Sequence, residues 1–132
     1  QDMIVERVRG IPMGEGRFRP VERIRLTAKA TAEYILLAYC LNFDRANPEP
    51  QSRFTVGGAD YPEVQKLFAV LPQAPPDQRT IGAVQTAIWV ITDDLTRGQL
   101  QSRFPATDAD IAAARQVLER AGIQAATKRL YR

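Results

Sequence analysis

The chain of 132 residues contains no histidine and a single cysteine, Cys40. The lack of histidine removes the Cys–His and Ser–His pairs that activate nucleophiles, and also the commonest metal ligand. One cysteine cannot form an internal disulfide bond. We therefore expect no triad hydrolase, no metal site and no cofactor.

Long apolar runs are also lacking, and none approaches the roughly 20 residues of a membrane-spanning helix. No basic-then-apolar signal segment opens the sequence. The chain begins at Gln1 rather than at methionine, so we expect a processed product or an excised fragment. Its length predicts a single domain, residues 1–132, large enough for a proper core. We expect this domain to be a monomer.

Lysine is scarce, so the net charge of +3 comes mostly from arginine. The first 30 residues are the most basic part, with arginines at 7, 9, 17, 19, 23 and 25. A nucleic-acid interface would need such residues on one face, with stacking aromatics between them. Phe18 is the only aromatic residue there, and three glutamates interrupt the charge. We expect a solvated strand face and rank nucleic-acid binding third among the functions.

Apolar and polar residues alternate in the first third of the chain, which predicts strands. We expect strands over residues 3–9, 21–29 and 33–43, with the last two joined as a hairpin by a turn at 30–32. Glycines and prolines predict a loop with tight turns over residues 10–20. The third strand is apolar on both faces, as a central strand would be. Cys40 would then be shielded near one end of that strand.

In the rest of the chain, apolar residues recur at the three- and four-residue spacing that predicts helices. A helix should begin at Tyr61-Pro62, and a second should run from Thr80 to Asp93, capped by Asp77 or Thr80, with a ragged continuation over 95–104. A capping box at Thr107–Asp110 should open a third helix, which Gly122 stops. Leu130 and Tyr131 would add an edge strand. The predicted class is α+β, a small and mostly antiparallel sheet or sandwich packed by about three helices.

One polar residue, Gln85, stands on the flank of an apolar helix face formed by Ile81, Val84, Ile88, Ile91 and Leu95. An amide taken out of water without partners costs roughly 2–7 kcal/mol. Something should therefore engage Gln85. Cys40, in the most apolar run of the chain, is a candidate, although a free cysteine is most often a small buried hydrophobe.

Two motifs around these residues carry a resemblance to a known family. Tyr39-Cys40-Leu41-Asn42 resembles the aromatic–Cys–hydrophobic–polar motif of bacterial thioester domains, which occur on surface adhesins of Gram-positive bacteria. Residues 84–89, Val-Gln-Thr-Ala-Ile-Trp, are similar to the Gln motif of that family. Because the segment between the motifs is shorter than is usual there, the chain would be a short variant.

The resemblance implies an internal thioester between the Cys40 sulfur and the Gln85 side-chain carbonyl. Such a bond acylates an amine or hydroxyl on a partner, here a surface protein or glycan. Because the bond reacts once, the protein would be a covalent adhesion module rather than an enzyme, secreted or displayed on a bacterial surface. Tyr39 belongs to the motif, Thr86 is a candidate to stabilise the oxyanion, and Trp89 is a candidate to cover the bond.

Two other interpretations of the sequence stay open. The chain could be a non-covalent protein-interaction module in which Cys40 and Gln85 are ordinary core residues. Asp93 and Asp94, near the end of the second predicted helix, could form a chemically active carboxylate pair, but a solvated loop start or cap explains them more simply.

Overall fold

The computed structural model describes residues 1–58 and 60–132, which divide into two units. The N-terminal unit, Met3–Tyr39, contains the strands, and the helical unit comprises Gln1–Asp2 and Cys40–Arg132. The predicted α+β class is confirmed, with a three-stranded antiparallel sheet. The described residues form four α-helices, where the sequence predicted about three.

Strand β1 (Met3–Gly14) is the longest strand and forms an antiparallel hairpin with β2 (Arg17–Pro20). The turn between them places Gly14, Glu15 and Gly16 at positive φ, which glycine adopts without steric cost. The loop predicted over residues 10–20 is therefore wrong. Gly14 and Gly16 serve a tight hairpin turn, and the two prolines stand within β1 and at the end of β2.

Gly10 has a separate reason to be glycine. A Cβ built there would lie 2.4 Å from the Arg19 carbonyl oxygen of the neighbouring strand. The absence of a side chain at this position lets the two strands approach each other. Gly10, which contributed to the loop prediction, is therefore part of the sheet.

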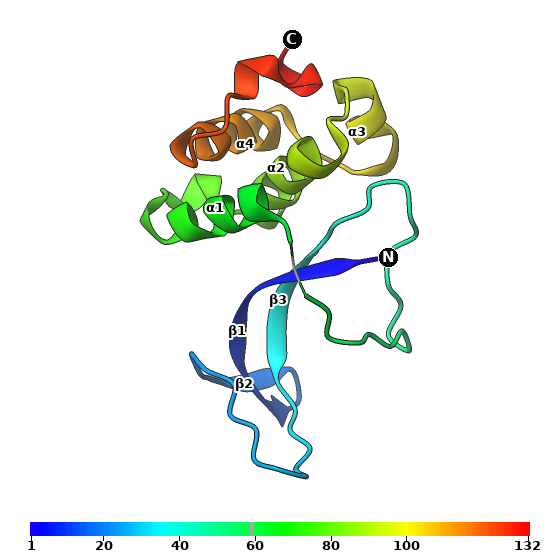
Figure 1. Cartoon of the computed structure of the whole chain (residues 1–132), viewed down its shortest axis with the longest axis vertical. Coiled ribbons are helices and arrows are strands. Elements are labelled where there is room, and N and C mark those ends of the chain that lie inside the picture. Colours follow the sequence, from blue (N-terminus) through cyan, green and yellow to red (C-terminus); the bar gives the residue numbers. More distant parts are fainter. Residues whose placement is uncertain (59) are drawn as a thin grey trace. The chain divides into compact units, whose positions relative to one another are not determined.

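The sheet has the order β2-β1-β3, so that β3 (Ile35–Cys40) is an edge strand (Figure 1). The prediction of a central third strand is wrong, because the longer β1 takes the central position and pairs on both sides. Leu36 of β3 keeps 43% of its surface exposed, as an edge strand allows. The strand predicted over 21–29 is also wrong. At Arg25 the backbone bonds to a side chain in place of a strand, since the Tyr34 hydroxyl accepts from the Arg25 N–H and donates to the Arg25 carbonyl.

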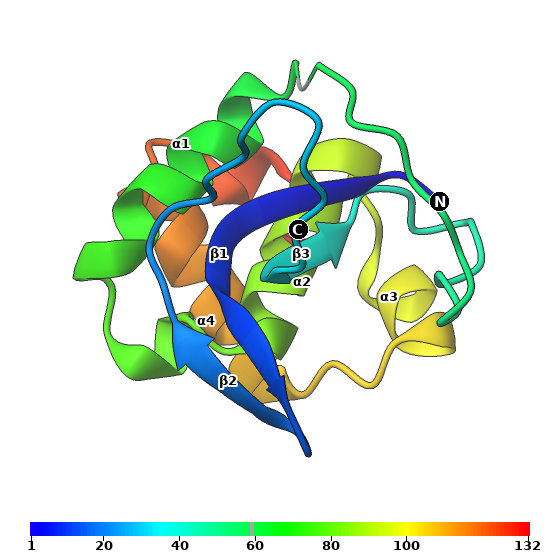
Figure 2. The ribbon, with the colours of Figure 1, turned by 90° about the horizontal axis from the view of Figure 1, so that it is seen from below.

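The helical unit is built from α1 (Pro62–Val70), α2 (Ile81–Asp93), α3 (Arg97–Arg103) and α4 (Asp108–Arg120). Helices α1, α2 and α4 pack against one another, and α2 has its most extensive contacts with α4 (Figures 1 and 2). Every side chain from Ala83 to Val90 is buried. Helix α2 is thus the core of this unit rather than a surface helix with one apolar stripe, and Ile81 of the predicted stripe is 66% exposed.

Helix ends follow the sequence signals closely. The Thr80 hydroxyl caps α2, Thr107 and Asp110 form the predicted capping box of α4, and Gly122 stands at positive φ where α4 stops. The ragged continuation predicted after α2 is wrong, because Asp94 ends α2 in a left-handed conformation and Thr96 opens α3 with its own capping box. Residues 129–131 form a 3₁₀ turn, not the predicted edge strand. Within the described part of the chain, no helix combines the length and apolarity needed to cross a bilayer.

Candidate functional site

The candidate site joins the last residue of β3 to the second turn of α2. The Cys40 backbone N–H donates to Gln85 Oε1 at 2.9 Å, and Gln85 Nε2 donates to the Cys40 carbonyl oxygen, also at 2.9 Å. Gln85 is only 6% exposed. The cost of burying this amide is therefore offset by two well-formed hydrogen bonds, both to Cys40. The partner that the burial of Gln85 requires is the backbone of the cysteine.

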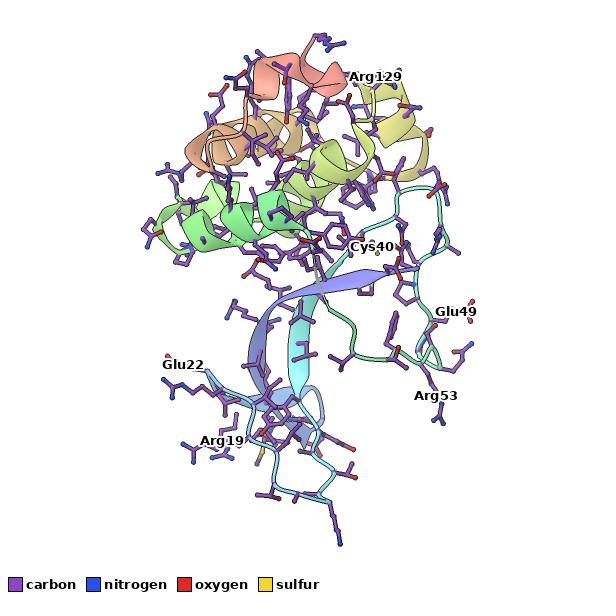
Figure 3. The ribbon with its side chains drawn as sticks, in the orientation of Figure 1. Arg19, Glu22, Cys40, Glu49, Arg53 and Arg129 are labelled. Atoms are coloured by element: carbon purple, nitrogen blue, oxygen red, sulfur yellow. The ribbon has the colours of Figure 1, made fainter. Side chains whose placement is uncertain are left out.

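The Cys40 thiol is half-buried at the end of β3 (Figure 3). Its Sγ lies 3.8 Å from Oδ1 of Asn47, close enough for a weak S–H···O contact. Burial raises the pKa of this thiol above its ordinary value of 9.0. At neutral pH the sulfur is therefore held as a thiol, which is a poorer nucleophile than a thiolate.

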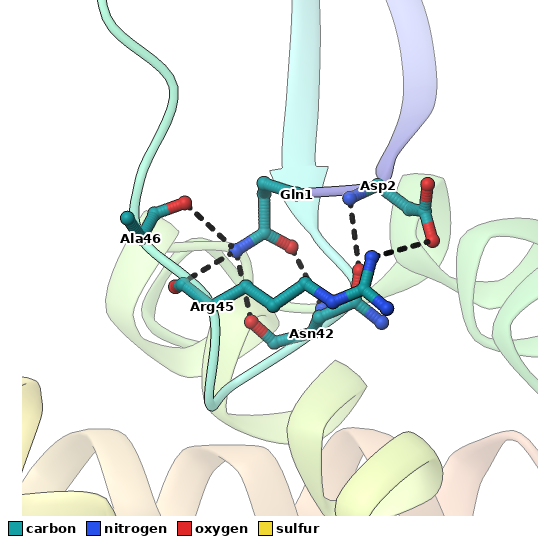
Figure 4. A network of polar contacts seen from close by, with 5 residues as sticks. All are labelled: Gln1, Asp2, Asn42, Arg45 and Ala46. Atoms are coloured by element: carbon teal, nitrogen blue, oxygen red, sulfur yellow. Dashed lines mark hydrogen bonds and ion pairs between the residues drawn. The ribbon is translucent and has the colours of Figure 1, made fainter.

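The segment after Cys40 is fixed by the first two residues of the chain (Figure 4). Gln1 and Asn42 bond reciprocally, because Gln1 Nε2 donates to the Asn42 carbonyl oxygen and Gln1 Oε1 accepts from the Asn42 N–H, each at 2.8 Å. The Asp2 N–H donates to Asn42 Oδ1, and the Leu41 N–H donates to the Asp2 carbonyl. This network holds the backbone on the C-terminal side of the thiol in place.

The three supporting residues predicted from the sequence lie in different surroundings. Tyr39 is buried, points to the opposite strand face from Cys40, and its hydroxyl lies 3.4 Å from a Glu6 carboxylate oxygen. Thr86 is fully buried, with its hydroxyl oxygen lacking a hydrogen-bond partner among the described residues. The carbonyl of Gln85 receives its hydrogen bond from Cys40, not from Thr86.

Trp89, one turn after Gln85, belongs to an aromatic cluster. Its ring makes edge contacts with Phe43 and Phe104 at centroid distances of 4.9 and 5.1 Å. The Arg103 guanidinium lies over Phe43 at 5.7 Å. These four residues, together with Arg45 and Asn47, line a small hollow of about 70 Å³, which we call the aromatic–arginine pocket.

A larger pocket of about 270 Å³ also involves the segment that follows Cys40. Leu41 and Asn42 line it, and so do the acidic residues Asp60, Glu63 and Asp93. These carboxylates are dispersed, and the described residues contain no group of three side chains suited to holding a metal ion. The pocket offers an acidic wall beside the thiol–amide pair.

Two other sequence candidates have local structural roles. Asp94 ends α2, and its carboxylate accepts from the Arg129 N–H at 2.9 Å. Asp93 instead accepts from the Thr92 hydroxyl, so the two aspartates engage separate partners. In the N-terminal unit, Arg7 and Arg17 each lie 3.4 Å from a neighbouring glutamate, and Arg9 lies over the Phe18 ring.

The sequence reasoning missed Asn47, Gln1 and the pocket around Trp89. Gln1 meets Asn42 across 41 positions, a separation at which no local periodicity operates. Phe43 carried a usable signal, since it is an aromatic residue that directly follows the cysteine motif. Comparison with known proteins gives no match to a family model, to a characterised protein or to a solved structure.

Proposed function

We propose that the protein is a covalent adhesion module in which Cys40 and Gln85 form an internal thioester. One observation supports the proposal above all others: the Gln85 carboxamide is held by two hydrogen bonds against the residue that carries the only thiol of the chain. The two residues are thus held side by side, and a sulfur brought into line with the amide carbon can gain roughly 7–11 kcal/mol toward a reaction that is uphill in free solution. The resemblance of the two sequence motifs to thioester domains points the same way.

The proposed reaction uses two residues that are already in contact through the backbone of Cys40. The Cys40 sulfur turns from Asn47 and attacks the Gln85 side-chain carbon, while the Cys40 N–H donates to the carbonyl oxygen on which negative charge develops. A donor 2.9 Å from that oxygen is at the distance expected of an oxyanion hole. The C–N bond breaks, the thiol proton leaves with the nitrogen, and one ammonia is released as the S–C bond forms.

The stored bond then reacts with a partner. An amine or hydroxyl attacks the thioester carbon, the S–C bond breaks, and the proton of the nucleophile returns to the Cys40 sulfur. The product is an amide or ester that joins the former Gln85 carbonyl to the partner. Each molecule reacts once, so the protein acts as a reactive anchor rather than as a catalyst with turnover. We place it, on the resemblance, on a bacterial surface or among secreted proteins.

Intact mass spectrometry tests this proposal. The native chain should be lighter than its sequence by one ammonia, and incubation with methylamine should add one methylamine to that product. A Cys40→Ala variant keeps both backbone hydrogen bonds to Gln85 and serves as the matched control. It should show the full sequence mass and no adduct. A wild-type chain at full sequence mass, inert to methylamine, would refute the thioester.

A non-covalent interaction module is the second candidate, and one feature favours it. Large apolar side chains are exposed in both units, among them Leu26, Phe54 and Val56. A partner protein that covered such residues would gain the free energy of burying their apolar surface. In this case Gln85 only caps the end of β3, and the thiol of Cys40 should react in full with a thiol reagent after unfolding.

A further inference from the structure

Trp89, which lines the aromatic–arginine pocket, carries an unsatisfied hydrogen-bond donor. Trp89 is 6% exposed, and its indole Nε1 is buried without an acceptor among the described residues. Buried donors in folded proteins are nearly always paired, with protein or with something bound. The pocket volume of about 70 Å³ is several times larger than the roughly 10–15 Å³ that one water molecule requires. The pocket therefore has room for an acceptor group larger than water.

The charge of the pocket walls indicates which acceptor fits. Arg103 contributes its guanidinium, which stacks on Phe43 and has no carboxylate partner in the described part of the chain. Arg45 contributes a second guanidinium, whose only acidic neighbour there is Asp2 at 3.9 Å. A carboxylate has two acceptor oxygens and a negative charge, which suit a pocket lined by two guanidinium groups.

The pocket adjoins the thiol. Asn47 lines the pocket and also lies 3.8 Å from Cys40 Sγ. A group seated in the pocket is thus separated from the candidate thioester by a single side chain. The larger pocket near Leu41 carries the opposite charge, with Glu63 and Asp93 in its walls, and would repel an acidic group.

We propose that the aromatic–arginine pocket binds a carboxylate. Given the thioester function, on which this second step rests, the carboxylate belongs to an acidic residue beside the nucleophile of a protein partner. The substrate class is then a lysine, serine or threonine flanked by aspartate or glutamate. The pocket would hold the acidic side chain while the neighbouring amine or hydroxyl meets the thioester.

A nuclear magnetic resonance titration tests the carboxylate site without any thioester chemistry. Trp89 is the only tryptophan, so its indole N–H gives one unambiguous peak in a ¹H–¹⁵N spectrum. In the Cys40→Ala chain, sodium acetate should shift this peak in a saturable manner. Sodium chloride at equal ionic strength and acetamide should not. Arg103→Gln should weaken acetate binding about tenfold, the loss expected of a charge-assisted hydrogen bond. Arg53→Gln, an exposed loop change of equal charge (Figure 3), should leave it unchanged.

A kinetic comparison in the wild-type chain tests the assignment to substrate. Two blocked dipeptides, Lys-Glu and Lys-Gln, carry the same amine and differ in one carboxylate. Adduct formation followed by intact mass should be several-fold faster with Lys-Glu, and Arg103→Gln and Trp89→Phe should abolish that preference.

The outcomes separate the two proposals. An indole peak that ignores acetate, or moves equally with chloride, overturns the carboxylate site whatever the state of the thioester. Equal rates for the two peptides, with methylamine still adding, overturn the assignment to substrate alone. An acetate-dependent shift in the Cys40→Ala chain, together with a wild-type chain that forms no amine adduct, supports the carboxylate site and refutes the thioester.

Discussion

At the scale of single residues, Gln85 engages the backbone of Cys40 and leaves the sulfur outside the hydrogen bonds. The side-chain amide completes the hydrogen bonding of the last residue of β3, as a neighbouring strand would. The sequence predicted that a buried glutamine needs a partner, and it predicted Cys40 as a candidate. It did not predict that the contact is with the backbone, because motif spacing fixes which residues meet but not which atoms.

The raised pKa of the Cys40 thiol has a measurable consequence. Methylamine-treated protein carries a free thiol at Cys40 whether or not a thioester preceded it. Because the thiolate is the reactive form and burial favours the neutral one, the midpoint of alkylation by iodoacetamide should lie at higher pH than for an ordinary cysteine, whose pKa is not raised. A short unfolded cysteine peptide, as the control, should approach its plateau at lower pH. Coincident pH profiles would contradict the burial seen at this site.

At the scale of elements, the two helical glycines provide a matched pair for stability. Replacing glycine by alanine inside a helix ordinarily stabilises it by about 0.8–1 kcal/mol. Gly98 of α3 has open space around it, so Gly98→Ala should raise the free energy of unfolding by about that amount. A Cβ on Gly82 of α2 would lie 2.6 Å from Asp110 Oδ2, an oxygen that the capping box of α4 holds in place. Gly82→Ala should therefore lower the free energy of unfolding, by about 1–3 kcal/mol.

Urea unfolding of the two variants measures both changes on one scale. If Gly82→Ala proved as stable as Gly98→Ala, Gly82 of α2 and Asp110 of α4 would have to lie further apart than they do in the structure. Adding Asp110→Ala to Gly82→Ala removes the clash together with the capping box, so the two substitutions should be non-additive.

Helices proved far more predictable than strands. Three of the four helices carry sequence signals within a few residues of their ends, a proline at the start of α1, Thr80 before α2 and the Thr107 box before α4. The short α3 lacked an apolar stripe long enough to stand out. Strand pairing depends on partners distant in sequence, so the edge position of β3 was not accessible to local alternation. Gly14 and Gly16 signalled a turn correctly, but they gave no sign of the strands on either side.

At the scale of the whole molecule, a thioester would close a loop between positions that are 45 residues apart. By the loop-entropy relation used for disulfide bonds, such a cross-link stabilises the fold by about 4 kcal/mol. Under the proposed function, opening the bond with methylamine should lower the free energy of unfolding of the wild-type chain by up to that amount. The Cys40→Ala chain should be insensitive to methylamine. Equal responses of the two chains in urea unfolding would argue that no cross-link was present.

The bonds that tie Gln1 and Asp2 to Asn42 also determine how the protein carries mechanical tension. A force applied at Gln1 is transmitted through these hydrogen bonds to Asn42 and Arg45 before it can separate β1 from its neighbouring strands. Tension entering at that end is therefore delivered two residues from Cys40. Under the proposed function, force applied at that end would therefore act on the bond between Gln85 and the partner before it acts on the sheet.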